Sequence, residues 1–205
     1  MNYYRPIVSY GKNRPKHAMP IAGGNAWFSE VEKLSRNENS TIITLKDVPG
    51  DILNNITCKR SNFSGLSMSN AHVMGVLNVT PDSFSDGGQH YDVDIAVRRG
   101  KEMLDEGASI VDIGGESTRP GADFVDRFSE LNRVSPVVDA LAELGIISVD
   151  TRKADVAREA ISQGAMIFND VSALSFDPRS LNVLAESGAS VCLMHASGDP
   201  QTMQD

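Results

Sequence analysis

Residues 76–88 read VLNVTPDSFSDGG, and this stretch decides how the rest of the sequence is interpreted. The apolar run that begins at Val73 has the composition of a buried strand. It ends at Asn78, and a polar segment rich in Gly and Pro follows almost at once. In α/β proteins, ligands gather at the carboxyl ends of the strands, where such loops begin. We therefore expect Asn78 and the loop behind it to belong to a functional site.

A rhythm of short strands and amphipathic helices continues from residue 72 onward. Apolar runs predict strands at about 73–78, 109–113, 146–150, 166–169 and 190–194. Between the strands, apolar residues recur every three or four positions, as they do on one face of a helix. They are Val93, Ala96, Val97, Gly100, Met103 and Leu104 in the first helix, and Val156, Ala157, Ala160 and Ile161 in the third. This alternation is typical of an α/β fold with a parallel sheet, either a closed (β/α)8 barrel or an open doubly wound sheet.

Two further signals mark the helix ends. Three of the joints between a helix and the next strand read Gly-Ala, at Gly107, Gly164 and Gly188, and the fourth has Gly145. Glycine just past a helix end is expected to adopt the left-handed backbone conformation. At the other end, Thr151 is a candidate cap for the third helix.

Residues 1–71 do not share this rhythm, and we expect them to form a separate N-terminal α+β extension. A strand pair is predicted at 26–31 and 41–45, with a short helix after Pro49. The predicted domains are therefore 1–71 and 72–205. The aromatic residues of the extension are expected to pack it onto the main domain: Tyr3, Tyr4, Trp27 and Phe28.

Composition narrows the class of protein. The chain has 205 residues, of which 40% are apolar and 22% charged, as in ordinary globular proteins. It contains no apolar window long enough for a membrane span and no signal peptide, so we expect a cytoplasmic protein without a membrane partner. The net charge is −8 and the Lys and Arg residues are scattered, which argues against a nucleic-acid partner. Cys58 and Cys192 lie far apart and are interpreted as packed apolar residues.

Polar residues follow each of the five predicted strands. The segments are NVTPDSFSDGG at 78–88, DIGGESTRPG at 112–121, DTRK at 150–153, NDVSA at 169–173 and HASGDP at 195–200. Asp112, Asp150 and Asn169 stand where they could bind a flat, nitrogen-rich ligand, since a buried carboxylate is costly without a donor. Arg119 offers a fork suited to phosphate, although the segment is neither a Walker loop nor a dinucleotide-binding fingerprint.

Each of these residues also has a simpler structural interpretation. Asn78 could be a turn residue, Asp150 could cap a helix, and Asn169 with Asp170 could close a turn. Glu116 and Arg119 could form an ion pair on the surface, which would contribute little to stability. Five polar segments at one edge of a parallel sheet nevertheless favour a shared site.

The five segments resemble the sequence motifs of dihydropteroate synthase. The matching stretches are NVTPDSFSDGG, DIGGESTRPG, SVDTRK, IFNDVSA and LMHASGDPQTM, in this order and at these intervals, over residues 72–205. The resemblance implies a (β/α)8 TIM barrel and a transferase of folate biosynthesis, the target of sulfonamides. Such an enzyme joins para-aminobenzoate to 6-hydroxymethyl-7,8-dihydropterin pyrophosphate and releases pyrophosphate. The full-length family is commonly a homodimer.

The resemblance implies which residues bind the pterin. Asp150 and Asn169 would hydrogen-bond its amino-pyrimidine edge, with Asp112 and Met194 nearby. Together with Arg119, Asp150 and Asn169 are the residues expected to carry catalysis, because the reaction requires stabilisation of charge rather than a protein nucleophile.

The resemblance also implies the rest of the site. Asn78, Thr118 and Arg119 would bind the pyrophosphate, and Asn78 would share a Mg²⁺ ion with it. Phe84 and Pro120 belong to the two loops that would fold over the aminobenzoate.

The length of the chain raises a question about completeness. It stops about 11 residues after the fifth predicted strand, whereas an eight-stranded barrel needs roughly 250 residues. We therefore expect about five βα units, a barrel incomplete at its C-terminus, and a chain that is inactive or impaired by itself. Two alternatives stay open: a non-catalytic pterin-binding remnant, and a domain of the methyltetrahydrofolate methyltransferase type. The second should lack the TPDSFSDGG and ESTRPG loops.

Overall fold

The computed structural model describes residues 1–80, 89–117 and 123–195, with the backbone alone for residues 89–92. The chain divides into two compact units, Met1–Ala71 and His72–Asp205. The boundary falls where the strand and helix rhythm of the sequence begins.

The first unit is a small α+β arrangement. A three-stranded antiparallel sheet has the order β1-β4-β5, and β2 pairs with β3 in a second, two-stranded sheet. The elements are β1 (Asn2–Pro6), β2 (Met19–Pro20), β3 (Trp27–Phe28), β4 (Glu30–Ser35), β5 (Thr41–Thr44), the 3-10 helix η1 (Leu45–Asp47) and α1 (Gly50–Thr57). Of the predicted strand pair, 41–45 agrees with β5, whereas 26–31 contains β3 and only the first two residues of β4, the strand that pairs with β5. The predicted helix after Pro49 is α1. Strand β1 was not predicted.

This unit has its own apolar core. Phe28 and Val31 are fully buried and form a cluster with Val48, against which Tyr4 also packs. The expectation that Phe28 packs the extension onto the main domain is therefore wrong, because its ring fills the core of its own unit. Tyr3 is 46% exposed.

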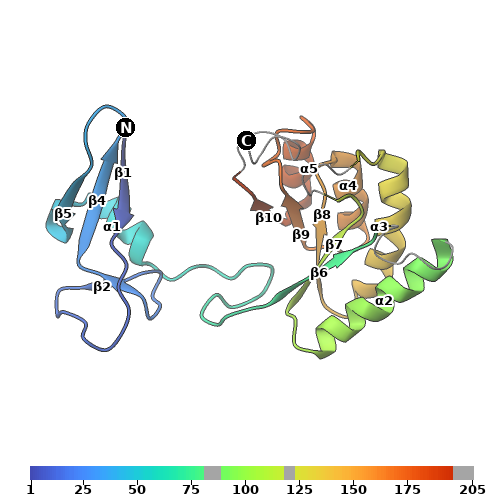
Figure 1. The fold of residues 1–205 in the computed structure, drawn as a ribbon, viewed down its shortest axis with the longest axis horizontal. Helices are drawn as coiled ribbons and strands as arrows, with labels where there is room; N and C mark the ends of the chain where they lie inside the picture. The colour runs from blue at the N-terminus through green and yellow to red at the C-terminus, as the bar shows by residue number, and fades with distance from the viewer. Residues whose placement is uncertain (81–88, 118–122, 196–205) are drawn as a thin grey trace. The chain divides into compact units, whose positions relative to one another are not determined.

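The second unit contains one parallel sheet with helices in its connections (Figure 1). The strand order is β10-β9-β8-β7-β6, so each strand lies beside the next one in sequence. The strands are β6 (Met74–Asn78), β7 (Ile110–Gly114), β8 (Ile146–Asp150), β9 (Ile167–Asp170) and β10 (Ser190–Leu193). The helices are α2 (Gln89–Asp105), α3 (Arg127–Leu141), α4 (Ala154–Ser162) and α5 (Ser180–Ser187). The predicted α/β class and parallel sheet are confirmed.

The helices cover one face of this sheet, and the main core lies between them (Figure 1). Because side chains alternate between the two faces of a strand, Leu77, Ile113 and Val149 face the helices. They pack against an apolar stripe on α3: Val134, Val137, Val138 and Leu141. The predicted apolar face of α2 joins the same core, with Ala96 fully buried. The residues next to the core positions in each strand therefore point to the opposite face.

The glycine joints agree with the prediction at three of four positions. Gly107, Gly164 and Gly188 have φ of 106°, 112° and 69°, the left-handed conformation that favours glycine. Gly145 does not have a positive φ, and close packing explains it instead. A Cβ at this position would lie 2.7 Å from Cδ2 of Leu104 on α2.

The predicted cap of α4 is wrong. The helix begins at Ala154, whose N–H donates to Oδ2 of Asp177 at 3.1 Å. Thr151 instead accepts a hydrogen bond from the backbone N–H of Lys153 at 3.1 Å, in the turn before the helix. The orphan N–H groups of a helix start can be satisfied by any nearby acceptor, and here a carboxylate from the segment after β9 supplies it.

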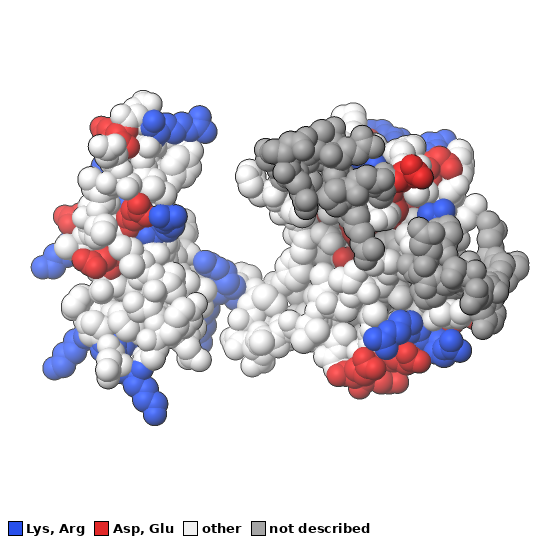
Figure 2. Space-filling view, in the orientation of Figure 1, with Lys and Arg blue, Asp and Glu red and all other residues white. Residues whose placement is uncertain are grey.

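Three sequence-based expectations concern the surface: membrane helices, basic patches and cysteines. Within the described ranges, no helix combines the length and apolarity that a membrane crossing requires. Lys and Arg side chains are spread over the visible face of residues 1–71 instead of forming one patch (Figure 2). Both cysteines are free thiols, but Cys58 is exposed, so its interpretation as a packed residue is wrong.

Candidate functional site

The carboxyl ends of four neighbouring strands place the predicted polar residues in one row. Asn78 is in register with Gly114, Gly114 with Asp150, and Asp150 with Asn169. Asp112 precedes Gly114 by two residues in β7, so its side chain lies on the same face, one layer deeper. This is the face opposite the helices. The structure thus brings together four of the residues predicted from sequence.

Gly114 keeps the centre of this row open. A Cβ on Gly114 would lie 3.5 Å from Oδ2 of Asp150 and 3.7 Å from Oδ1 of Asn78. The side chains of Asn78 and Asp150 therefore flank the same small space above Gly114. Any larger residue would fill that space.

Asp112 forms the floor of the site. Its side chain is 4% exposed, and its Oδ2 accepts a hydrogen bond from Nδ2 of Asn169 at 2.9 Å. Burial raises the pKa of Asp112, while the neighbouring Ser148 hydroxyl and the Asn169 amide oppose that rise. Ser148 Oγ is buried and makes no hydrogen bond within ordinary donor–acceptor distances among the described residues. Asp112 Oδ1 has no described partner either.

Asp150 is the most perturbed carboxyl group of the site. Burial raises its pKa to about 7, and the negative charges of Asp112 and Glu130 add to the effect. Its Oδ1 is buried without a hydrogen-bond partner among the described residues. A buried acceptor without a donor costs free energy, so Asp112 Oδ1 and Asp150 Oδ1 would both gain from a ligand that brings N–H groups.

The alternative that Asn169 and Asp170 close a turn holds for Asp170 but not for the side chain of Asn169. Asp170 is fully buried, and its carboxylate accepts hydrogen bonds from Ser172 and from the backbone N–H of Leu174 at 2.7–2.9 Å. Asp170 therefore closes the turn after β9, which leaves Asn169 to contact Asp112. Met194 follows β10 directly, and its N–H donates to the Asp170 carbonyl oxygen at 3.2 Å. It is 37% exposed.

The remaining predicted site residues cannot be placed. Phe84, Thr118, Arg119 and Pro120 lie outside the described residues. The structure does describe both flanks of the second loop, which are residues up to 117 and from 123 onward.

A buried charged cluster lies at the base of that second loop. Glu116 is 4% exposed, and its carboxylate accepts two hydrogen bonds from Arg152 at 3.0 Å and one from Lys153 at 2.7 Å. Lys153 Nζ also contacts Oε2 of Glu130 at 2.5 Å, and Glu130 is fully buried. The alternative that Glu116 forms an exposed surface pair is therefore wrong.

The two carboxyl groups of this cluster titrate differently. Burial would raise the pKa of Glu116, but the hydrogen bonds from Arg152 and Lys153 outweigh it and the pKa falls. For Glu130, burial dominates and raises the pKa despite the hydrogen bond from Lys153. Sequence reasoning missed this cluster. The available signal was Glu130 itself, which stands one helical turn before Val134 on the apolar stripe of α3.

The residues present fit a magnesium ion only in part. Over the ranges that the structure describes, no group of three or more His, Cys, Asp and Glu side chains is arranged to hold a metal. Mg²⁺ commonly needs one or two protein oxygens, with waters and substrate phosphates completing its octahedron. The amide oxygen of Asn78 beside Gly114 is suited to such an ion. The chain thus fits a Mg²⁺ brought by a phosphate ligand better than a metal held by protein alone.

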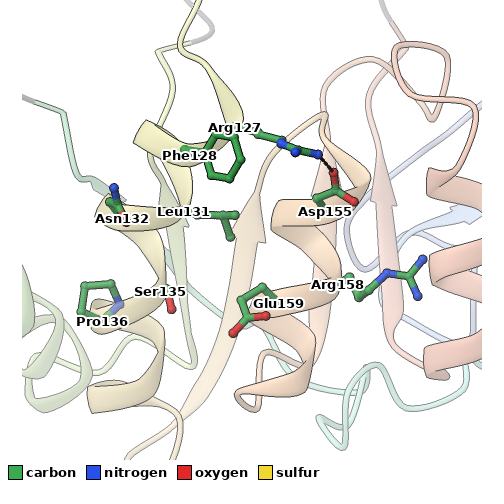
Figure 3. A pocket seen from close by; sticks show the side chains of 9 residues that line it. All are labelled: Arg127, Phe128, Leu131, Asn132, Ser135, Pro136, Asp155, Arg158 and Glu159. Carbon is green, nitrogen blue, oxygen red and sulfur yellow. Dashed lines mark hydrogen bonds and ion pairs between the residues drawn. The ribbon is translucent and has the colours of Figure 1, made fainter.

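A separate groove of about 660 Å³ lies between α3 and α4 (Figure 3). An ion pair between Arg127 and Asp155 at 2.9 Å crosses it. The lining residues are Arg127, Phe128, Leu131, Asn132, Ser135, Pro136, Asp155, Arg158 and Glu159. None of the site residues predicted from sequence is among them, so the groove is distinct from the strand ends.

Comparison with known proteins identifies the fold and its relatives. Residues 74–205 match the model of the family described as pterin binding enzyme. Dihydropteroate synthase of Escherichia coli K12 is 53% identical over 144 residues, which cover 69% of this chain and 51% of that protein. The chain therefore spans about half the length of the curated relatives it matches.

Solved structures give the same result. Dihydropteroate synthase of Yersinia pestis, in complex with a sulfonamide drug, superposes with a TM-score of 0.62 at 51% identity, over 68% of this chain and 51% of that one. The enzyme of Xanthomonas albilineans with 4-aminobenzoic acid also gives 0.62, at 47% identity over 66% of this chain and 50% of that one.

Proposed function

The chain belongs to the pterin-binding enzyme family, and on that premise we propose that it is part of a dihydropteroate synthase. The proposed reaction joins para-aminobenzoate to 6-hydroxymethyl-7,8-dihydropterin pyrophosphate, giving 7,8-dihydropteroate and pyrophosphate. One observation carries this proposal: two buried carboxylate oxygens, Asp112 Oδ1 and Asp150 Oδ1, stand at the strand ends without a donor among the described residues. A pterin presents an amino group and a ring N–H side by side and would supply such donors.

Pterin recognition is assigned to the row at the ends of β7, β8 and β9. Asp150 would accept hydrogen bonds from the amino-pyrimidine edge. Its pKa is about 7 in the structure, and N–H donors from the pterin would stabilise its ionised form. Asn169 would pair with the same edge, held in orientation by its hydrogen bond to Asp112. Met194, which follows β10, would contact the ring. A flat ligand with several donors suits this set of acceptors better than a sugar or a peptide does.

The diphosphate would lie toward β6 and the second loop. Asn78 stands at the tip of β6, on the far side of Gly114 from Asp150. We assign Thr118 and Arg119 to the pyrophosphate oxygens, since a guanidinium forks onto phosphate and a hydroxyl can donate to it. Asn78 would share a Mg²⁺ ion, which when bound neutralises charge on the leaving group.

In the proposed reaction, the role of these residues is to stabilise charge. The bond between the pterin methylene carbon and the pyrophosphate oxygen breaks, the electron pair leaves with the oxygen, and positive charge spreads into the pterin ring. Asp150, once ionised, would stabilise that charge at short range. The amine nitrogen of para-aminobenzoate then bonds to the methylene carbon and loses a proton. Phe84 and Pro120 are assigned to the loops that would exclude water from this step.

We further propose that the sheet is part of a (β/α)8 barrel in a cytoplasmic enzyme, and that the complete protein is a homodimer. The resemblance to barrel enzymes of about 50% identity supports the first part. Size-exclusion chromatography with light scattering tests the second, and a monomer at micromolar concentration would refute it.

Isothermal titration of the whole 205-residue chain tests the function. The ligands are the dihydropterin alcohol and its pyrophosphate, each with and without Mg²⁺. We expect both ligands to bind, and we expect Mg²⁺ to raise the affinity of the pyrophosphate only. Asp150→Ala should lower the affinity for both ligands, whereas Arg119→Ala should lower the affinity for the pyrophosphate alone. The proposal fails if neither ligand binds or if both substitutions leave the affinities unchanged.

A second candidate is a pterin-binding chain without catalytic activity, since the two carboxylate oxygens without described donors would bind a pterin whether or not a reaction follows. The two candidates differ in one measurement. Incubation with both substrates and Mg²⁺ yields dihydropteroate if the chain is an enzyme, and binding without product identifies the second candidate.

A further inference from the structure

Glu116 is a buried carboxylate whose role the proposed reaction does not use. It stands two residues after β7 ends at Gly114, and it precedes Thr118 by two residues. Its side chain receives four hydrogen bonds from three residues: Arg152, Lys153 and the backbone N–H of Val125. A glutamate so close to a loop of this kind would normally be solvated, so its burial indicates a specific function.

The bond from Val125 closes the second loop at its base. Val125 N–H donates to Glu116 Oε1 at 3.0 Å, across nine positions of sequence. Residues 117–124 are therefore joined at both ends through one carboxylate.

The same carboxylate ties this base to the segment after β8. Arg152 and Lys153 follow Asp150 by two and three residues, and both donate to Glu116. Helix α3 holds the preceding residue, because Arg133 donates to the Gly115 carbonyl oxygen at 2.8 Å. A Cβ on Gly115 would lie 2.7 Å from Cγ2 of Val134, so this position packs against α3 too closely for any side chain.

Two aromatic rings lie close to the cations of the cluster. The Arg152 guanidinium lies 4.3 Å from the centroid of the Phe176 ring and 5.8 Å from that of Phe124. Lys153 Nζ lies 5.0 Å from the Phe124 centroid. Phe124 lies on the described C-terminal flank of the second loop, so this flank contacts the cations that bind Glu116.

Stability alone explains this arrangement poorly. Buried ion pairs often contribute no more than apolar residues of similar volume, because desolvation of the charges offsets their attraction. Their better attested contribution is to fix one arrangement of the chain. We propose that Glu116 is a positioning residue: its carboxylate holds the two described flanks of the second loop, at Glu116 and Val125, against the segment that follows Asp150. The assignment rests on the proposed function only for the ligand that the loop would meet.

Glu116→Gln tests directly whether the Glu116 carboxylate holds Val125. An amide has one acceptor oxygen and two N–H groups, so it cannot accept from all four donors. Lys153 keeps its contact with Glu130, so the fold should survive. We expect amide hydrogen exchange at Val125 to become about tenfold faster, as befits the loss of a hydrogen bond to a charged group. Glu102→Gln, which removes an exposed partner of Arg99, is the matched control and should leave Val125 unchanged.

The effect of Glu116 on ligand binding is tested with two ligands. For Glu116→Gln, affinity for inorganic pyrophosphate should fall about tenfold while affinity for the dihydropterin alcohol stays within twofold, because only the loop is displaced. A merely structural role would weaken both ligands alike. Should Glu116→Gln fail to fold, Arg152→Gln removes the paired hydrogen bonds and keeps Lys153, with the same pattern expected at reduced size.

Three results overturn the inference: unchanged exchange at Val125, faster exchange with unchanged pyrophosphate affinity, or equal losses for both ligands. The proposed function fails separately. If the unsubstituted chain binds neither pyrophosphate nor the pterin alcohol, the reaction is refuted, and the exchange rate at Val125 still decides whether Glu116 clamps the loop.

Discussion

The side-chain amide of Asn169 donates a hydrogen bond to Asp112, with 2.9 Å between Nδ2 and Oδ2. The two residues come from strands that are not neighbours, since β8 lies between them. The contact therefore crosses the floor of the site and links the second and fourth strands of the sheet. It also leaves the other carboxylate oxygen of Asp112 without a described donor, beside the perturbed Asp150.

Replacement of Asp150 by asparagine should stabilise the protein in a manner that depends on pH. The pKa of Asp150 is about 7 in the folded chain, against an ordinary value of 3.8. Between these values the folded state binds more protons than the unfolded state, so the free energy of unfolding falls as pH rises. Asp150→Asn removes this fall. Urea denaturation should show a gain on the order of a few kcal/mol at pH 8 and little gain at pH 4.

The same substitution should abolish pterin binding, which would mark Asp150 as a residue kept for function at a cost in stability. Equal pH dependence of the unsubstituted chain and Asp150→Asn would refute the assignment of a perturbed carboxyl group to this position.

Asp112→Asn should change Asp150 at a distance. The negative charge of Asp112 is the second largest cause of the raised pKa of Asp150, after burial. Its removal should lower that pKa, which carbon NMR of the Asp150 carboxyl group measures directly. Ser172→Ala, which alters the turn around Asp170, serves as a control and should leave the pKa near 7. A pKa of Asp150 that stays the same or rises in Asp112→Asn would contradict the geometry of the floor.

Lys153→Met should be among the most destabilising changes in the chain. It leaves Glu116 and Glu130 buried with one donor fewer each, and the loss of one member of a buried pair costs about 3–5 kcal/mol. Arg158→Met, which removes an exposed ion pair to Glu186, should cost less than about 1 kcal/mol. Chemical denaturation compares the two. Similar costs for both variants would show that the cluster is solvated rather than buried.

Asp177→Ala tests the observed start of α4 against the predicted one. The substitution removes the acceptor for the Ala154 N–H and a partner of Arg179, and it should cost about 1–2 kcal/mol. Thr151→Ala, the cap predicted from sequence, should cost clearly less. The reverse order in thermal unfolding would restore the prediction that Thr151 caps the helix.

The sequence predicted the second unit well because its signals are local. Strand ends at Asn78 and Asp150 agree with the observed bounds of β6 and β8, and the apolar face of α2 was read from periodicity alone. The resemblance to dihydropteroate synthase is likewise confirmed by relatives at about 50% identity. Parallel strands place their carboxyl ends at one edge, so the row of site residues follows from the fold.

Tertiary contacts were harder to predict. The sequence suggested Arg119, three positions away, as the ionic partner of Glu116, yet the charged donors are Arg152 and Lys153, 36 and 37 positions away. The acceptor at the start of α4 comes from the segment after β9. Sequence separation hides such partners, because periodicity shows that a residue is buried but not what it meets. Strand β1 was not predicted either, and its partner β4 lies about 30 residues further along the chain.

The expectation that the 205-residue chain is inactive or impaired by itself stays a prediction. Pteroate formation from both substrates measures it, and turnover comparable to a full-length relative would refute it.

The central claim is that the strand ends around Asp150 hold one pterin through a carboxylate that ionises on binding. Titration calorimetry of the dihydropterin alcohol at pH 7, repeated in buffers of different ionisation enthalpy, tests it most directly. With a pKa of about 7, Asp150 should release about half a proton per pterin bound in a 1:1 complex, and Asp150→Asn should bind far more weakly with no proton release. Absence of binding, or identical affinity and proton release in the two proteins, would contradict the account.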